Sequence, residues 1–328
     1  MEKSVKKSSF ITFILCTVGF ALTGFAIQIK NPVLTVLGFG VIQGIGLGFG
    51  YITPIKAMML WFINNKGLAA GLSIAGFALA GIITNPMIVF LLRIVPVYSV
   101  FYILAGLYGV LLFVSHLLID KPEIDLPTEQ IDKTFSMVKL IFSKKFALLW
   151  LVFFLNIACG LALISQEKQI YHLLGVTSPS TIVFYCSISA LWNLAGRMIM
   201  ASLQDKLKNK HVPYYFMVIA SILLCSIAAL NPGTLAGTLT MMWGINFFFG
   251  AGFSCLPNIL EQNYGMEHLS SVQGISLSAW AIAGLIGNQF ALFFINNYNL
   301  SVFYVFLFIL YVVEFIILLF WTRVIKKK

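Results

Sequence analysis

The feature that most constrains this chain is a series of long segments without a charged side chain. Eight stretches contain no Asp, Glu, Lys or Arg: residues 8–29, 31–55, 67–92, 94–119, 146–166, 169–196, 212–260 and 268–313. A helix needs about 20 apolar residues to cross a bilayer. Only 10 % of the residues are charged, whereas soluble domains carry about 25 %. The sequence therefore predicts an integral membrane protein.

Each of the first six stretches fits one helix, and the last two are long enough for two helices each. The turn-forming sequences Asn231-Pro232-Gly233 and residues 296–299 divide these two stretches. The sequence thus predicts an all-α, polytopic membrane helix bundle with ten transmembrane helices. Their expected ranges are about 10–28, 33–62, 67–92, 98–119, 146–168, 180–203, 213–230, 235–260, 271–295 and 300–322.

A polar segment divides these helices into groups of four and six. Residues 120–145 contain five acidic residues and five lysines, which is typical of a solvated linker. We therefore predict an incomplete N-terminal half-bundle at 1–119, a cytoplasmic linker at 120–145, and a C-terminal six-helix half-bundle at 146–328.

The distribution of Lys and Arg predicts the orientation. With the N-terminus inside, sixteen of these 21 residues fall in inner segments, and three (Lys30, Arg93 and Lys168) fall in outer ones. Cytoplasmic loops are enriched in Lys and Arg. Both termini are therefore expected in the cytoplasm of a cell-membrane protein.

The net charge of +10 follows from this topology, so nucleic-acid binding is not expected. The five cysteines form no CxxC pair, and the four histidines show no metal-ligand spacing. No metal, cofactor or enzymatic activity is expected. The expected partners are the lipid bilayer and a small organic anion.

An internal repeat appears when the sequence is shifted by 203 residues. Seven identities of Pro, Gly, Ser, Ala and Asn fall within one ungapped window of 32 residues, beginning with Pro54 and Pro257 and ending with Asn85 and Asn288. Chance recurrence of small residues is the alternative. Both copies run in the same direction through the membrane. Parallel repeats of this kind describe the two halves of major facilitator transporters.

Specific motifs strengthen this interpretation. Residues 44–54 read Gly-Ile-Gly-Leu-Gly-Phe-Gly-Tyr-Ile-Thr-Pro, and residues 66–69 read Lys-Gly-Leu-Ala. Together with Gly160–Ser165 and Asn193–Arg197, they resemble the oxalate/formate antiporter family of the major facilitator superfamily, which is related to the monocarboxylate transporters.

The resemblance aligns the chain with family helices three to twelve, so the first two family helices are expected to be absent. The cytoplasmic signature that in the family contains glycines has Ala201 and Leu203 here. Some members carry a lysine in the eleventh helix for a dianionic substrate. Trp280 takes that place, which argues against oxalate.

Arg197 is the strongest candidate for substrate binding, because a buried cation is costly and usually functional. Tyr185, Ser189, Asn193 and Arg197 recur every four residues and form one polar stripe. A guanidinium binds carboxylates in a bidentate manner. Structural pairing or snorkelling of Arg197 is the alternative. No acid lies close to Arg197 on the same predicted helix, so a proton-coupling carboxylate is not visible.

Five further residues are candidates, and most of them have an alternative role. Trp280 is expected to limit cavity size or simply to pack between helices. Tyr51 and Lys56 are expected to line the cavity, although Lys56 also fits a snorkelling role. By the family resemblance Asp205 makes a gating contact, and a solvated loop acid is the alternative. Glu314, the one acid deep in a predicted span, is expected to pair with a lysine or to titrate.

Two functions remain open from the sequence. The first is a secondary active transporter of small, monocarboxylate-like organic anions that works by alternating access, with exchange or ion symport. The second is a truncated, non-transporting membrane protein or gene fragment of such a carrier. The family motifs present in the ten predicted helices favour the first, and the expected absence of two helices favours the second.

Overall fold

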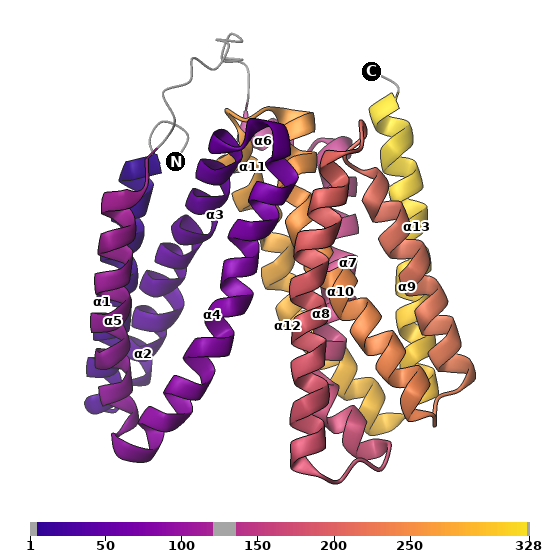
Figure 1. Ribbon diagram of the computed structural model, residues 1–328, viewed down its shortest axis with the longest axis horizontal. Coiled ribbons are helices and arrows are strands. Elements are labelled where there is room, and N and C mark those ends of the chain that lie inside the picture. The colour runs from indigo at the N-terminus through magenta and orange to yellow at the C-terminus, as the bar shows by residue number, and fades with distance from the viewer. Residues whose placement is uncertain (1–4, 121–135, 327–328) are drawn as a thin grey trace. The chain divides into compact units, whose positions relative to one another are not determined.

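The computed structural model describes residues 5–120 and 136–326, and every regular element in these ranges is helical (Figure 1). Part of the predicted linker, 121–135, lies outside the described residues. The first helices are α1 (Val5–Gln28), α2 (Pro32–Thr35), α3 (Gly44–Trp61), α4 (Lys66–Ile94) and α5 (Val97–Leu118). After the short α6 (Met137–Ile141) come α7 (Lys144–Leu173), α8 (Pro179–Asp205), α9 (Val212–Leu230), α10 (Leu235–Tyr264), α11 (Leu269–Ser276), α12 (Ser278–Asn297) and α13 (Leu300–Lys326).

The long helical segments occupy the positions predicted from the charge-free stretches. Among the described residues nine segments are long and apolar enough to cross a membrane. The remaining predicted span, 67–92, coincides with the 29-residue helix α4. Because main-chain polar groups have no water partner in the bilayer, satisfying them within helices is what makes these segments stable there.

Two predicted helices are less regular than expected. The span predicted at 33–62 consists of α2, a π-helical stretch at Val36–Gln43 and α3. The span predicted at 271–295 is divided at Leu277 into α11 and α12. The repeat does place equivalent prolines alike, since Pro54 lies inside α3 and Pro257 lies inside α10.

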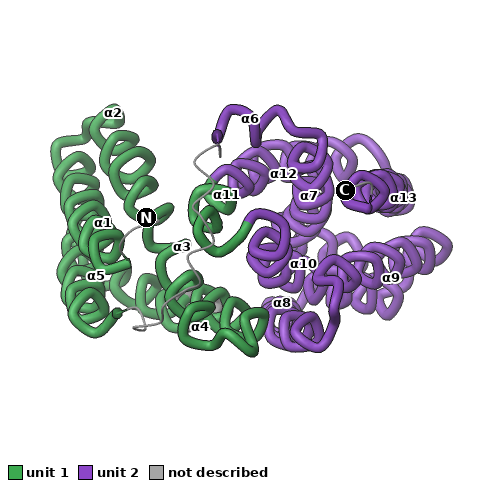
Figure 2. The backbone as a smooth tube through the Cα atoms, turned by 90° about the horizontal axis from the view of Figure 1, so that it is seen from above, with its two compact units in different colours: residues 1–128, 265–274 green, residues 129–264, 275–328 purple. Residues whose placement is uncertain are grey.

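The chain forms two compact units, shown in different colours in Figure 2. Unit 1 contains Met1–Thr128 and Gly265–Gly274, and unit 2 contains Glu129–Tyr264 and Ile275–Lys328. In unit 1, α1 packs against α3 and α5, and α3 also contacts α4. The predicted half-bundle boundaries stay a prediction.

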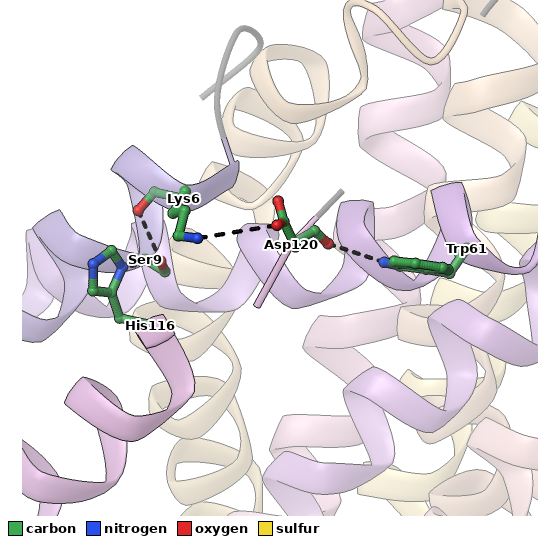
Figure 3. A network of polar contacts seen from close by, with 5 residues as sticks. All are labelled: Lys6, Ser9, Trp61, His116 and Asp120. Atoms are coloured by element: carbon green, nitrogen blue, oxygen red, sulfur yellow. Dashed lines mark hydrogen bonds and ion pairs between the residues drawn. The ribbon is translucent and has the colours of Figure 1, made fainter. Parts of the chain in front are cut away.

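One end of unit 1 is closed by polar contacts (Figure 3). The Ser9 hydroxyl hydrogen-bonds the backbone oxygen of Lys6 at 2.8 Å and the ring Nδ1 of His116 at 2.9 Å. Trp61 Nε1 donates to the backbone oxygen of Asp120 at 2.9 Å, and the Lys6 ammonium lies 4.0 Å from the Asp120 carboxylate. These bonds connect the start of α1 with the ends of α3 and α5.

Unit 2 is organised around α7 and α10. Helix α7 contacts α8, α10, α12 and α13, and α10 contacts α8 and α9. The core of this unit is apolar and includes Leu163, Ile245 and Leu307, all without exposed surface. A few polar side chains are also buried in this unit, and they form the candidate site.

Candidate functional site

The polar stripe of α8 faces α10. Close approach of the two helices depends on two glycines. A Cβ at Gly196 would collide with the backbone oxygen of Phe247, and a Cβ at Gly250 would collide with the backbone oxygen of Asn193. Small residues allow membrane helices to approach each other this closely. The predicted stripe therefore lies largely within a helix–helix contact.

Arg197 is held by its own helix and by an aromatic ring of α10. Its Nε donates to Asn193 Oδ1 at 2.9 Å, and its guanidinium carbon lies 5.7 Å from the centre of the Phe253 ring. The spacing of four residues brings the Asn193 amide next to Arg197, as expected on a helix. These contacts hold the cation in a defined orientation inside the membrane-spanning part of α8.

Trp280 packs against Phe253, the same ring that lies beside Arg197. The rings of Phe253 and Trp280 meet edge to face, with their centres 5.8 Å apart. Phe253 also packs against Phe153 and Phe249. Arg197 and Trp280, both predicted site residues, thus lie against the same aromatic ring. Phe253 cannot be singled out from the sequence, because one phenylalanine among 30 carries no signal of its own.

Asn246 of α10 continues the polar stripe across the helix contact. Its side-chain amide donates to the Ser189 hydroxyl at 2.8 Å, and its backbone oxygen accepts a hydrogen bond from Asn193 at 3.3 Å. All three residues are at least nine-tenths buried. A connected series of polar groups therefore extends from Arg197 through Asn193 and Asn246 to Ser189.

An acid that the sequence analysis did not consider lies beyond Ser189. Glu167 of α7 is only 6 % exposed, and its carboxylate accepts a hydrogen bond from the Tyr171 hydroxyl at 2.8 Å. The Ser189 side chain of α8 lies beside this carboxylate. Glu167 directly follows the charge-free stretch 146–166. In the sequence this position indicates the end of a membrane-spanning helix and not a functional residue.

Tyr51 and Lys56 belong to unit 1, and both are buried. Tyr51 is 8 % exposed and its ring lies 5.0 Å from that of Phe77. Lys56 is 6 % exposed and lines a small pocket together with Ser8, Thr53 and Ser270. Their participation in a substrate site with the residues of unit 2 stays a prediction.

Asp205 and Glu314 have different surroundings within unit 2. Asp205, the last residue of α8, accepts a hydrogen bond from Asn258 Nδ2 at 3.3 Å, and its gating role stays a prediction. Glu314 of α13 has no exposed surface. Its carboxylate lies beside the Asn156 side chain of α7. No lysine is seen paired with it within the described part of the chain.

The comparisons with known proteins agree with this architecture. The model of the Major Facilitator Superfamily matches residues 3–288, so the chain belongs to this superfamily of transporters. The match confirms the predicted fold class, a polytopic membrane helix bundle of the major facilitator type. The family-level resemblance to oxalate/formate antiporters is confirmed as well, by a relative described next.

Two curated relatives are distantly similar over most of the chain. The uncharacterised MFS-type transporter YhjX of Escherichia coli is 24 % identical over 289 residues, which are 86 % of this chain and 70 % of YhjX. The oxalate:formate antiporter of Oxalobacter formigenes is 24 % identical over 264 residues, or 79 % of this chain. The matched region covers 62 % of the length of that antiporter.

A solved structure has the same fold. The fucose:proton symporter FucP of E. coli superposes with a TM-score of 0.70, covering 98 % of this chain and 85 % of FucP. The two sequences are 16 % identical, so the similarity concerns the arrangement of the helices and not the substrate.

Proposed function

We propose that this protein is a secondary active transporter of small organic anions with a single carboxylate. The observation that carries the proposal is the geometry of Arg197. A cation lies in a membrane-spanning helix, is oriented by Asn193, and stands against an aromatic wall formed by Phe253 and Trp280.

This arrangement suits a short monocarboxylate. A guanidinium recognises both oxygens of a carboxylate, because its N–H groups form a planar fork. The aromatic rings beside it offer an apolar surface for the remaining carbon atoms of the substrate. The carboxylate in turn lowers the cost of holding a cation in the membrane. A second carboxylate would meet aromatic carbon at Phe253 and Trp280, and this disfavours dianions such as oxalate.

The relatives support the same substrate class. One of them is an oxalate:formate antiporter, and formate is a monocarboxylate. We infer alternating access between the two sides of a cell membrane, with both termini in the cytoplasm. In this proposal Tyr51 and Lys56 contribute to the substrate path from unit 1, and Asp205 acts as a gating residue at the end of α8.

Replacement of Arg197 tests the proposal. The purified protein is titrated with formate and with pyruvate while its thermal unfolding is followed, and exchange of each labelled anion is measured in proteoliposomes. We expect Arg197→Ala to weaken binding by roughly 10- to 100-fold, as for loss of a charged hydrogen-bond partner. Arg197→Lys keeps the charge but loses the planar fork, so it should also lose most of the exchange activity.

Arg93→Ala is the matched control, because Arg93 lies exposed in the last turn of α4. It should bind and exchange both anions like the unmodified protein. Normal exchange of formate and pyruvate by Arg197→Ala would contradict the proposal and leave Arg197 as a structural cation. Elution of each variant as a single species from a sizing column shows that the fold is retained.

A further inference from the structure

The buried carboxylate of Glu167 stands at the far end of the polar series that begins at Arg197. From Arg197 Nε the bonds lead to Asn193, then to Asn246, then to Ser189, with lengths of 2.9, 3.3 and 2.8 Å. Ser189 lies beside the Glu167 carboxylate, which accepts a hydrogen bond from the Tyr171 hydroxyl. One buried acid and one cation are therefore joined through a short connected path in unit 2.

The other ionisable groups around Glu167 are few. Tyr171 and Lys168 lie on the same helix as Glu167, and the Lys168 side chain is exposed. Helix α8 contributes Tyr185 and Cys186. Helix α10 presents Trp243 and Asn246, and α12 presents Asn288, which accepts a hydrogen bond from Gln166.

Helix α13 contributes Glu314, but at a different depth. Glu314 lies next to Asn156 and Cys159 of α7. Asn156 is about 16 Å from Glu167 along the helix at about 1.5 Å per residue. Glu314 is thus remote from Glu167, and the polar series that begins at Arg197 and runs through Asn193, Asn246 and Ser189 ends at Glu167.

The charges of the two residues suggest how they act together. In the empty site the guanidinium and the ionised carboxylate balance each other. When an anion binds Arg197, the site acquires a net negative charge in a region where uncompensated charge is costly. One proton on Glu167 restores neutrality. The empty and the loaded site are then both neutral, and each can cross between the two orientations of the carrier.

We propose that Glu167 is the proton-binding site of this transporter and that it couples uptake of one proton to uptake of one carboxylate at Arg197. The inference rests on the proposed function and adds its coupling ion. It also predicts a specific defect. Without the acid, the loaded site stays neutral but the empty site keeps the charge of Arg197. The carrier can then return only with an anion bound.

Glu167→Gln should therefore turn a symporter into an obligate exchanger. Proteoliposomes are assayed with labelled formate and labelled pyruvate in two ways. One assay measures exchange at equal pH, and the other measures net uptake driven by an inward proton gradient. We expect exchange to remain within about twofold of the unmodified protein, while net uptake falls by about fiftyfold or more, the factor for an uncompensated charge in the membrane.

Glu267→Gln is the control, because Glu267 is an exposed acid paired with His268 in the segment between α10 and α11. Both activities should remain. If Glu167→Gln still accumulates the probe in a proton gradient, or if the unmodified protein exchanges both anions but ignores the gradient, Glu167 is not the proton site. If the unmodified protein neither binds nor exchanges the two probes, the proposed function itself fails.

Ser189→Ala provides a second test should Glu167→Gln not fold. This variant keeps the acid but removes its connection to Asn246. If Glu167 is the proton site, the pH at which net uptake is half-maximal should differ between Ser189→Ala and the unmodified protein. An unchanged pH midpoint in Ser189→Ala would overturn the proposed coupling path.

Discussion

At the scale of single residues, the site consists of polar side chains that lie inside the membrane-spanning helices, where such groups are costly and therefore rare. An arginine in a spanning helix is expensive unless its surroundings relieve the charge. Asn193 provides one oxygen for Arg197 Nε, and the Phe253 ring provides the negative face of an aromatic system. The same phenylalanine also packs against Trp280, so a change at Trp280 can shift the ring that lies beside the guanidinium. A change at Trp280 should therefore affect the substrate and not only the packing.

Trp280→Ala should broaden the range of carboxylates that bind. Removal of the indole opens space beside Phe253, and one or two added carbons change affinity by about 1–3 kcal/mol when a pocket accepts or rejects them. The ratio of affinities for 2-oxobutyrate, which is one carbon longer, and pyruvate should thus rise by about tenfold or more, measured by thermal stabilisation.

Trp192→Ala is a closely matched control. Trp192 also meets a phenylalanine of α10 edge to face, since its ring centre lies 5.9 Å from that of Phe247. This tryptophan is 45 % exposed and is not in contact with Phe253 through any described ring pair. If both tryptophan variants leave the affinity ratio unchanged, Trp280 serves only helix packing.

At the scale of helices, the contact between α8 and α10 determines where the polar stripe can act. The two helices approach until backbone oxygens stand where a Cβ of Gly196 or Gly250 would be. This approach is what brings Asn246 within hydrogen-bond distance of Ser189 and Asn193. The polar series from Glu167 to Arg197 therefore depends on small residues that carry no chemistry themselves.

Gly196→Ala should destabilise the protein by about 1–3 kcal/mol, as overpacking of a tight contact does. The added methyl group meets the backbone of Phe247, which cannot move aside as a flexible side chain would. Gly48→Ala is the control, because a Cβ at this exposed residue of α3 meets nothing within 4 Å.

Alanine is also the better helix former, so Gly48→Ala should keep or slightly raise the midpoint of thermal unfolding in detergent. Equal midpoints for the two alanine variants would show that the α8–α10 contact is looser than the structure has it.

The pH dependence of stability at the start of α9 follows from His211. Burial and the nearby positive charge of Lys326 lower the pKa of His211 below its usual value of 6.5. The unfolded chain then binds more protons than the folded one in the range just below pH 6.5, so stability falls as the pH is lowered through that range.

His211→Gln should lose this dependence, and unfolding midpoints measured between pH 7.5 and about pH 5 would show it. The ring of His211 lies 5.5 Å from that of Trp321, so the variant is expected to lower the midpoint at all pH values as well. A midpoint that responds to pH as steeply in His211→Gln as in the unmodified protein would assign the effect to other groups.

At the scale of the whole molecule, the sequence predicts the spanning segments well and the contacts between them poorly. Helices in a membrane follow from local composition, since any long apolar segment must satisfy its own backbone there. The π-helical stretch at Val36–Gln43 and the break at Leu277 lack a proline and could not be foreseen. Glu167 and Asn246 became visible only when distant helices were placed side by side.

The orientation in the membrane is a property of the entire chain, and the distribution of Lys and Arg makes it testable. Asn231 is exposed between α9 and α10, and Lys208 is exposed between α8 and α9. The loops alternate sides, so a cysteine introduced by Asn231→Cys should react with an impermeant maleimide added outside intact cells. One introduced by Lys208→Cys should react only after the membrane is opened.

The native cysteines have to be removed first, although four of the five are buried and Cys186 is half-buried. Both positions lie in unit 2, and the sixteen inner Lys and Arg residues predict Lys208 to be cytoplasmic and Asn231 to be external. Labelling in the reverse order would invert the topology. It would also move the Glu167 end of α7 from the outer to the inner side of the membrane.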